Sequence, residues 1–250
     1  MASKAVSFPS SKGHALAARL EQPAGKPHAW AIFAHCFTCS KDSKAAAYIS
    51  QALAGRGIAV LRFDFTGLGM SGGEFAESNF SSNIDDLAYA AKFLKENYRP
   101  VDILIGHSLG GAAVIAAAAR VAEARAVATI GAPYEPAHVS HLINAPDMLR
   151  DGEAQVDIGG RPFRIRKQFL DDLTRHDSAK TIAALGKALL VMHSPRDRIV
   201  GIDNAAKIFT AAKHPKSFVS LDDADHLLSR SGDAGYAAEV LAAWSSRFLK

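Results

Sequence analysis

The sequence predicts an α/β protein with a mostly parallel central sheet and helices on both faces. Short apolar runs alternate with longer helical stretches along the 250 residues. Several of these runs are apolar throughout, as expected for parallel strands that are buried on both faces. Hydrophobic residues make up 48% of the chain and charged residues 22%, so the chain can bury a large core. We therefore expect one domain, spanning residues 1–250.

The strands are expected in chain order, and the first two are joined by a turn-rich segment at 10–13. The expected strands are Val6–Phe8, Ala15–Leu20, Ala29–Ala34, Ile58–Phe63, Val101–Ile105, Ala126–Ile130, Ala188–Met192 and Ser217–Leu221. The expected helices are Lys44–Leu53, Ser82–Asn97, Gly110–Val121, Ile202–Ala212 and Tyr236–Phe248. In the second of these helices, apolar residues recur with the helical period.

Residues 133–185 interrupt this alternation, because the stretch is too long for an ordinary connection. Within it, Ala154–Ile158 and Arg161–Arg166 flank Gly159-Gly160, a pattern that predicts a β-hairpin. Phe169–Leu173 then favours a short helix. We interpret 133–185 as a small insertion that caps one end of the sheet.

Composition argues against several classes of protein. Two cysteines are too few for a disulfide-stapled scaffold, and no apolar run approaches the roughly 18 residues of a membrane span. The formal net charge is +4, with Lys and Arg scattered, so binding of nucleic acid is not expected. The first residues lack the apolar core of a secretory signal. We expect a cytoplasmic protein that binds neither nucleic acid nor a membrane.

Ser108 is the predicted nucleophile. Gly106-His-Ser-Leu-Gly110 is a G-x-S-x-G motif that follows an apolar strand and precedes a small-residue helix. A sharp turn between strand and helix would lift the serine Oγ above the sheet, and two glycines would allow close backbone approach. The pentapeptide alone is a weak signal, but its position between a strand and a helix favours a catalytic turn over a glycine-rich turn without chemistry.

Asp197 and His226 are the predicted acid and base. A serine hydroxyl needs a base that an acid orients, and the order Ser, Asp, His fits this type of strand-to-helix turn. Asp197 follows the strand that contains Leu189–His193, and His226 follows the last strand. The carboxyl ends of parallel strands share one edge of a sheet, where ligands bind. Asp225 is a weaker candidate acid, because adjacent side chains generally cannot face each other.

The oxyanion hole is expected from two backbone N–H groups, those of Leu109 and Phe37. Cys36 is the alternative to Phe37 as donor, because both lie in the loop after the strand Ala29–Ala34. We expect Phe37, Tyr134 and His138 to face the substrate, although Tyr134 could equally serve packing.

Several segments of the chain resemble the α/β-hydrolase superfamily. Arg62–Ser71 is similar to its D-x-x-G-x-G-x-S turn, in which Asp64, Gly67, Gly69 and Ser71 brace a loop near the site. A closer resemblance, to the hydrolase half of bacterial fusions with an OsmC-like domain, is carried by Phe33–Asp42, Asn79–Asn83, Val156–Phe163 and Asp222–Leu228. It implies an α/β-hydrolase fold, esterase-like activity and an OsmC-like domain or protein as a partner. Those relatives carry His-Gly where this chain has His35-Cys36. The 250 residues include no OsmC-like half, so we expect either a truncated fusion or a stand-alone relative.

Cys36 and Cys39 form a C-x-x-C pair beside the predicted oxyanion loop. The rest of the chain does not favour a thioredoxin-like protein, and a metal site would need further ligands. We favour packing and loop-shaping roles, with a redox-sensitive thiol as the alternative.

The expected function is hydrolysis of small to medium carboxylic esters through an acyl-enzyme, with no cofactor and no metal. An acyltransferase, thioesterase, amidase or perhydrolase could use the same residues. A non-catalytic binding module, such as a partner of an OsmC-like protein, is the alternative outside enzymes. The sequence leaves the oligomeric state and the acyl and alcohol specificity open.

Overall fold

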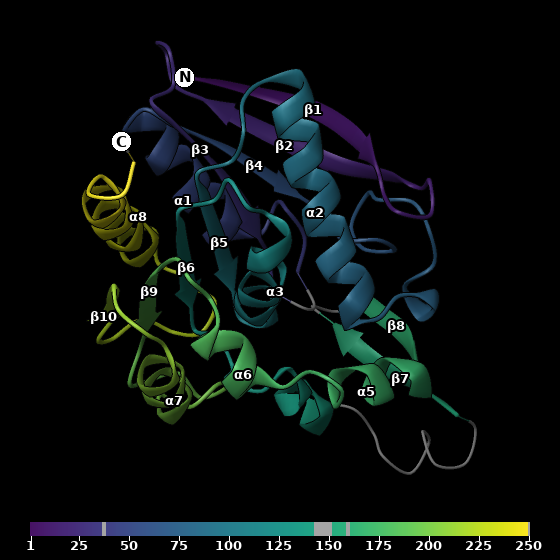
Figure 1. Ribbon diagram of the computed structural model, residues 1–250. Helices are drawn as coiled ribbons and strands as arrows, with labels where there is room; N and C mark the ends of the chain where they lie inside the picture. Colours follow the sequence, from purple (N-terminus) through teal and green to yellow (C-terminus); the bar gives the residue numbers. More distant parts are fainter. Residues whose placement is uncertain (37–38, 143–151, 159–160, 250) are drawn as a thin grey trace.

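A central sheet of eight strands organises the part of the chain that the computed structural model describes, residues 1–36, 39–142, 152–158 and 161–249. The strand order is β1-β2-β4-β3-β5-β6-β9-β10 (Figure 1). β1 and β2 pair antiparallel, as do β2 and β4, and the remaining pairs are parallel. The strands are β1 (Ala2–Pro9), β2 (Ala15–Gln22), β3 (Ala29–Ala34), β4 (Ile58–Phe63), β5 (Ile103–His107), β6 (Ala126–Ile130), β9 (Ala188–His193) and β10 (Lys216–Ser220). All eight expected strands are confirmed.

Helices cover both faces of this sheet. α1 and α8 pack on one face, and α2, α3 and α7 pack on the other (Figure 1). The helices are α1 (Lys44–Gly55), α2 (Phe80–Asn97), α3 (Leu109–Ala117), α5 (Lys167–Leu173), α6 (Ser178–Ala183), α7 (Asp203–Ala211) and α8 (Ser231–Ser245), with 3-10 turns η1 (Phe75–Glu77), η2 (Ala118–Arg120) and η3 (Pro136–Leu142). Parallel strands therefore alternate with crossover helices, as the apolar periodicity predicts.

The central strands are mostly apolar because each contributes to two cores. In β3, Trp30 and Ile32 belong to the core beneath α2 and α3, whereas Ala31 and Phe33 belong to the core beneath α1 and α8. Successive strand residues point to opposite faces, so burial on both sides favours apolar side chains at most positions. β3, β4, β5, β6 and β9 are all buried in this way.

Helix boundaries differ from the expected ones where local hydrogen bonds decide them. α2 begins at Phe80, two residues earlier than expected, because Asn79 and Ser82 form a capping box. Their distances are 2.7 Å from Ser82 N to Asn79 Oδ1 and 2.9 Å from Asn79 N to Ser82 Oγ. α8 begins at Ser231 rather than at residue 236, since the glycines of its first turns weaken the helical signal in the sequence.

Residues 133–185 carry a second, two-stranded sheet. β7 (Glu153–Ile158) and β8 (Arg161–Arg166) pair antiparallel, with Val156 opposite Phe163. The ring of Phe163 lies 5.5 Å from that of Phe75 in η1. The Asp172 carboxylate on α5 accepts hydrogen bonds from Ser81 N and Oγ, at 2.7 and 2.8 Å. In Figure 1 the hairpin and α5 lie together beside one end of α2.

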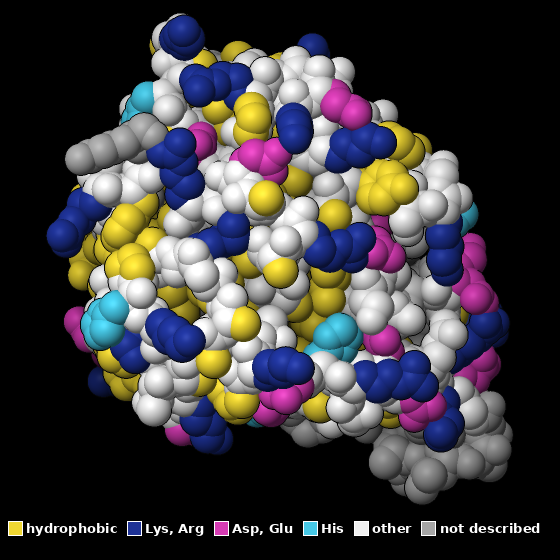
Figure 2. Space-filling view, in the orientation of Figure 1, with side chains coloured by type: hydrophobic (Ala, Val, Ile, Leu, Met, Phe, Trp, Pro, Cys, Tyr) yellow, Lys and Arg dark blue, Asp and Glu magenta, His cyan; other side chains and the backbone are white. Residues whose placement is uncertain are grey.

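The surface mixes charges of both signs. On the face shown in Figure 2, Lys and Arg lie among Asp and Glu rather than in a single stripe. Of the helices in the described residues, none combines the length and the hydropathy that crossing a membrane requires.

Candidate active site

Ser108 occupies a sharp turn between β5 and α3, with φ 56° and ψ −128°. This left-handed region is costly for a residue with a side chain, so neighbouring contacts must hold the backbone there. Ser108 N donates to Ile130 O on β6 at 2.9 Å, and Gly111 N donates to Ser108 O at 2.8 Å. A Cβ on Gly106 would collide with the backbone of Gly110, so the turn needs glycine at that position.

The side chains of Ser108, His226 and Asp197 meet at the carboxyl ends of their strands. His226 Nε2 lies 3.0 Å from Ser108 Oγ, and His226 Nδ1 lies 2.7 Å from Asp197 Oδ2. An ionised carboxylate only accepts hydrogen bonds, so Nδ1 carries the proton and the neutral imidazole offers Nε2 as an acceptor for the serine hydroxyl. All three residues are buried. Residues separated by 29 and 118 positions are thus connected in the predicted order.

The second oxygen of Asp197 fixes the loop after β9. Oδ1 accepts hydrogen bonds from Ile199 N and Val200 N, both at 2.9 Å. Burial raises the pKa of Asp197, but the hydrogen bonds from His226 and from these backbone N–H groups outweigh it, so the pKa lies below its usual value. The carboxylate therefore stays ionised and accepts from His226.

Two further buried histidines hold the loops that carry the acid and the base. His107 Nε2 donates to His226 O at 2.6 Å, and His193 Nε2 donates to Val200 O at 2.8 Å. Burial lowers the pKa of both, to about 3 for His107. Each imidazole is therefore neutral and serves as a backbone anchor. Neither histidine was identified as an anchor from the sequence. For His107, the G-x-S-x-G motif leaves the residue at that position unspecified.

Gly131, directly after β6, was also missed. Its φ is 56°, and a Cβ there would lie 3.2 Å from Asp197 Oδ2 and 3.4 Å from His226 Nδ1. A side chain at this position would press on the hydrogen bond between acid and base. The only signal in the sequence is a glycine that ends a buried strand at the ligand-binding edge.

The expected oxyanion donors fall partly outside the described residues. Leu109 starts α3, where backbone N–H groups have no partner within the helix. Phe37 lies outside the residues that the structure describes, so neither its N–H nor its ring can be placed. Cys36 is buried and is joined to Cys39 by a disulfide that the sequence did not predict. In the described residues, no group of three or more His, Cys, Asp or Glu side chains could hold a metal ion.

A buried ionic network fixes the far end of this loop. Lys41 N and Nζ donate to the two carboxylate oxygens of Asp64, at 2.6 and 2.9 Å. Arg62 donates to Lys41 O and, through Nη2, to Glu21 Oε1 at 2.9 Å. Ser71 Oγ donates to Asp64 O at 2.5 Å. The turn that contains Asp64 therefore braces the loop, as its resemblance to the superfamily implies.

Tyr134 and His138 lie on the segment after β6, Tyr134 just before the 3-10 turn η3 and His138 within it. Tyr134 lines a small cavity together with Ala112 and Ile115 of α3, and that lining includes none of Ser108, Asp197 or His226. The ring nitrogen Nε2 of His138 lies 3.1 Å from Ile199 O, which connects η3 to the loop after Asp197.

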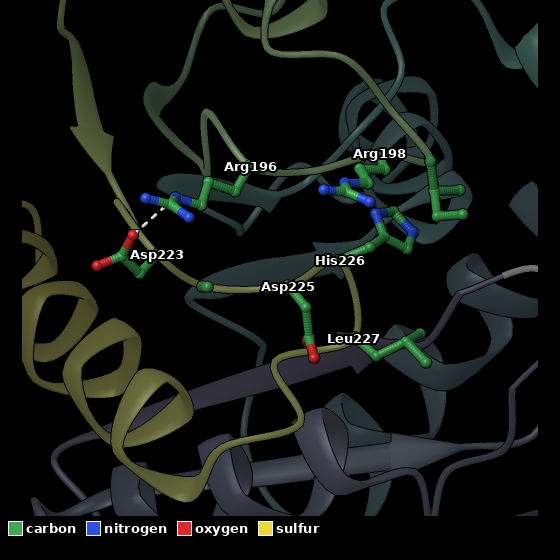
Figure 3. A pocket seen from close by; sticks show the side chains of 8 residues that line it. Arg196, Arg198, Asp223, Asp225, His226 and Leu227 are labelled. Carbon is green, nitrogen blue, oxygen red and sulfur yellow. Dashed lines mark ion pairs between the residues drawn. The ribbon is translucent and has the colours of Figure 1, made fainter.

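Two hollows border the site. A groove of about 430 Å³ lies between the loops after β9 and β10, with His226 in its wall (Figure 3). A smaller cavity of about 10 Å³ adjoins Leu109 and Gly110, and its other lining is mostly apolar, including Phe65, Leu68 and Phe75.

Comparisons with known proteins identify the family. A sequence model described as the alpha/beta hydrolase family matches residues 31–239. The chain belongs to the alpha/beta hydrolase family. An esterase domain of a Rhodothermus marinus protein is 55% identical over the full length of both chains, with a TM-score of 0.85. No curated protein matches.

More distant structures share the fold of this hydrolase. Est1E from Butyrivibrio proteoclasticus with bound ferulic acid is 17% identical, with a TM-score of 0.81 over 98% of this chain and 99% of that one. The alpha/beta hydrolase GrgF from Penicillium sp. sh18 is 18% identical, with a TM-score of 0.80 over 100% and 99%. The fold class expected from the sequence is confirmed, and the chain is an esterase-like alpha/beta hydrolase. The resemblance to OsmC fusions stays a prediction.

Two glycines should respond oppositely to replacement by alanine. A Cβ at Gly110 would meet the backbone of Ala34 and His35, whereas a Cβ at Gly235 in α8 would meet nothing within 4 Å. We expect Gly110→Ala to lower the free energy of unfolding by about 1–3 kcal/mol through overpacking. Gly235→Ala should raise it by about 0.5–1 kcal/mol, because alanine favours a helix. Urea unfolding measures both, and equal effects would contradict the close approach at Gly110.

His107 should make stability depend on pH. Its pKa falls from 6.5 to about 3 on folding, so below pH 6.5 the unfolded chain takes up a proton that the native chain does not. The free energy of unfolding must therefore decrease as the pH is lowered. His107→Gln keeps an N–H donor without titrating. Between pH 6.5 and 4.5 we expect the variant to lose roughly 2–3 kcal/mol less than wild type, at about 1.4 kcal/mol per unit.

The matched control is His14→Gln, at an exposed histidine. Urea unfolding of the three proteins at both pH values supplies the comparison. If wild type and His107→Gln lose the same free energy, His107 is not the source of this dependence.

Proposed function

We propose that the protein is a carboxylic ester hydrolase in which Ser108, His226 and Asp197 form a catalytic triad. The observation that carries this proposal is the pair of distances of 3.0 Å from Ser108 Oγ to His226 Nε2 and 2.7 Å from His226 Nδ1 to Asp197 Oδ2. A nucleophile, its base and the acid that orients the base are in contact. The R. marinus esterase domain, 55% identical to this chain, supports an ester as the substrate.

The proposed reaction proceeds in two steps. Ser108 Oγ attacks the ester carbonyl carbon while its proton passes to His226 Nε2, and Asp197 stabilises the imidazolium that forms. Nε2 then gives this proton to the departing alcohol oxygen, which leaves an acyl-enzyme. Water then attacks the acyl carbonyl carbon while one of its protons passes to His226 Nε2. Nε2 returns this proton to Ser108 Oγ, which releases the carboxylic acid and free Ser108. The reaction requires no cofactor.

The tetrahedral intermediates need hydrogen bonds to their oxyanion. We assign these to Leu109 N–H, at the start of α3, and to Phe37 N–H, with Cys36 N–H as the alternative to Phe37. The positive end of the α3 dipole points at the same oxygen. The network of Lys41, Asp64 and Arg62 supports this assignment, because it fixes the loop that carries the second donor.

Small to medium acyl esters are the proposed substrates. The cavity beside Leu109 is lined mostly by apolar side chains, which supports an apolar acyl group on this side. We propose that residues 133–185 form a cap within the single domain and that Phe37, Tyr134 and His138 limit the substrate there. An acyltransferase, thioesterase, amidase or perhydrolase would share the acyl-enzyme and differ in the bond broken or the acceptor. A non-catalytic partner of an OsmC-like protein would not need the contacts among the three side chains.

Replacement of Ser108 and Asp197 tests the triad. Ser108→Ala should abolish both burst and turnover with 4-nitrophenyl esters, because it removes the nucleophile. Asp197→Asn should lower kcat by about 10⁴-fold, since the amide no longer holds the imidazole in the required tautomer. Release of 4-nitrophenol from esters of graded acyl length supplies both measurements.

Circular dichroism should show both variants folded. If wild type cleaves no ester, thioester or amide, the non-catalytic alternative is favoured. If Ser108→Ala retains wild-type turnover, the nucleophile lies elsewhere.

A further inference from the structure

The groove beside His226 contains an arginine that has no partner in the described residues. The loops after β9 and β10 supply its walls, including Arg196, Arg198, Asp223 and Asp225 (Figure 3). At about 430 Å³, the groove has the volume of a small-ligand site. His226 is the one residue of the proposed triad among those that line it.

The other charged groups of the groove are already occupied. Arg196 Nε lies 2.8 Å from Asp223 Oδ1. Asp225 Oδ1 accepts a hydrogen bond from Ser229 N at 2.9 Å, and in Figure 3 its carboxylate points away from both arginines. With the residues that the structure describes, the guanidinium of Arg198 forms neither a hydrogen bond nor an ion pair. Arg198 is therefore the arginine of this groove whose guanidinium is free to bind a ligand, while Asp225 keeps its own negative charge there.

The backbone of Arg198 is held by the same carboxylate that orients His226. Arg198 lies between Asp197 and Ile199, and Asp197 Oδ1 accepts from the backbone N–H groups of Ile199 and Val200. His193 fixes Val200 O from the other side. An arginine on a turn fixed in this way loses less conformational freedom when it binds a ligand than one on a mobile loop.

The position of the groove beside His226 indicates which portion of an ester it would accommodate. His226 Nε2 gives its proton to the departing alcohol oxygen, so the alcohol portion of an ester lies against His226. The oxyanion side, by contrast, adjoins the apolar cavity at Leu109. We therefore place the alcohol portion toward Arg198 and the acyl group toward the cavity at Leu109.

We propose that Arg198 binds an anionic group on the alcohol portion of the substrate, so that the enzyme prefers esters whose leaving alcohol carries a carboxylate. This inference rests on the proposed ester hydrolysis. A planar guanidinium matches a carboxylate through two parallel hydrogen bonds. The same anion offsets the repulsion between Arg198 and the imidazolium that His226 becomes during the reaction, since like charges in one groove disfavour each other.

A pair of esters with similar shape tests the preference. 4-Acetoxybenzoate carries a carboxylate on its leaving phenol, and 4-acetoxybenzamide carries a neutral amide in its place. The readout is the ratio of kcat/KM for the acid over that for the amide, compared between enzymes so that intrinsic reactivity cancels. Arg198→Gln should lower this ratio about tenfold, which corresponds to about 1.4 kcal/mol. Arg198→Glu should lower it further.

Arg196→Gln is the matched control, because it makes the same change in the same groove at a guanidinium already paired with Asp223. Its ratio should stay within about twofold of wild type. The inference is overturned if Arg198→Gln leaves the ratio unchanged, or if both variants lower it equally through the net charge alone. In either case ester hydrolysis that depends on Ser108 would still stand. If wild type hydrolyses neither these two esters nor any of the 4-nitrophenyl esters, the proposed function itself fails.

Discussion

The left-handed backbone of Ser108 is the constraint on which the rest of the site depends. A serine at φ 56° is unfavourable, and it is held there by a hydrogen bond to β6 and by glycines that let α3 approach β5. The parallel sheet supplies the rigidity that this geometry needs, because its central strands are buried on both faces. The cost of the turn is therefore offset by the core beneath it, and its result is a hydroxyl held at the carboxyl edge of the sheet, 3.0 Å from His226 Nε2.

Hydrogen bonds to main-chain carbonyls hold the two loops that surround this hydroxyl. The loops that carry the proposed acid and base have no regular structure, yet each is fixed by an uncharged imidazole that donates to a main-chain carbonyl. Burial keeps these imidazoles neutral, so they can act as donors without adding positive charge beside His226. The site thus separates two uses of histidine, one for proton transfer and two for support.

The sequence predicted the parts of the molecule that follow local rules. Apolar runs predicted β3, β4, β5, β6 and β9, and the rule that strand ends meet at one edge placed Ser108, Asp197 and His226 together. The parts that depend on long-range contacts could not be predicted. Nothing near His107 in the sequence indicates a bond to a carbonyl 119 residues away, and nothing near Gly131 indicates that Asp197 and His226 lie beside it. The bounds of α8 were wrong at the start, because two glycines masked a helix that packing stabilises.

The salt bridge between Arg62 and Glu21 connects the amino-terminal hairpin to the loop that follows β3. β1 and β2 contribute no reacting group, yet Glu21 on β2 neutralises the guanidinium that also holds Lys41 O. Removing one partner of a buried ion pair leaves a desolvated charge, which costs about 3–5 kcal/mol. A shortened version of this enzyme that discards the first two strands would leave Arg62 with the half-exposed Asp42 as the carboxylate it hydrogen-bonds, at the loop that follows β3. Shortened versions of the protein must therefore keep β1 and β2, which form this edge of the sheet.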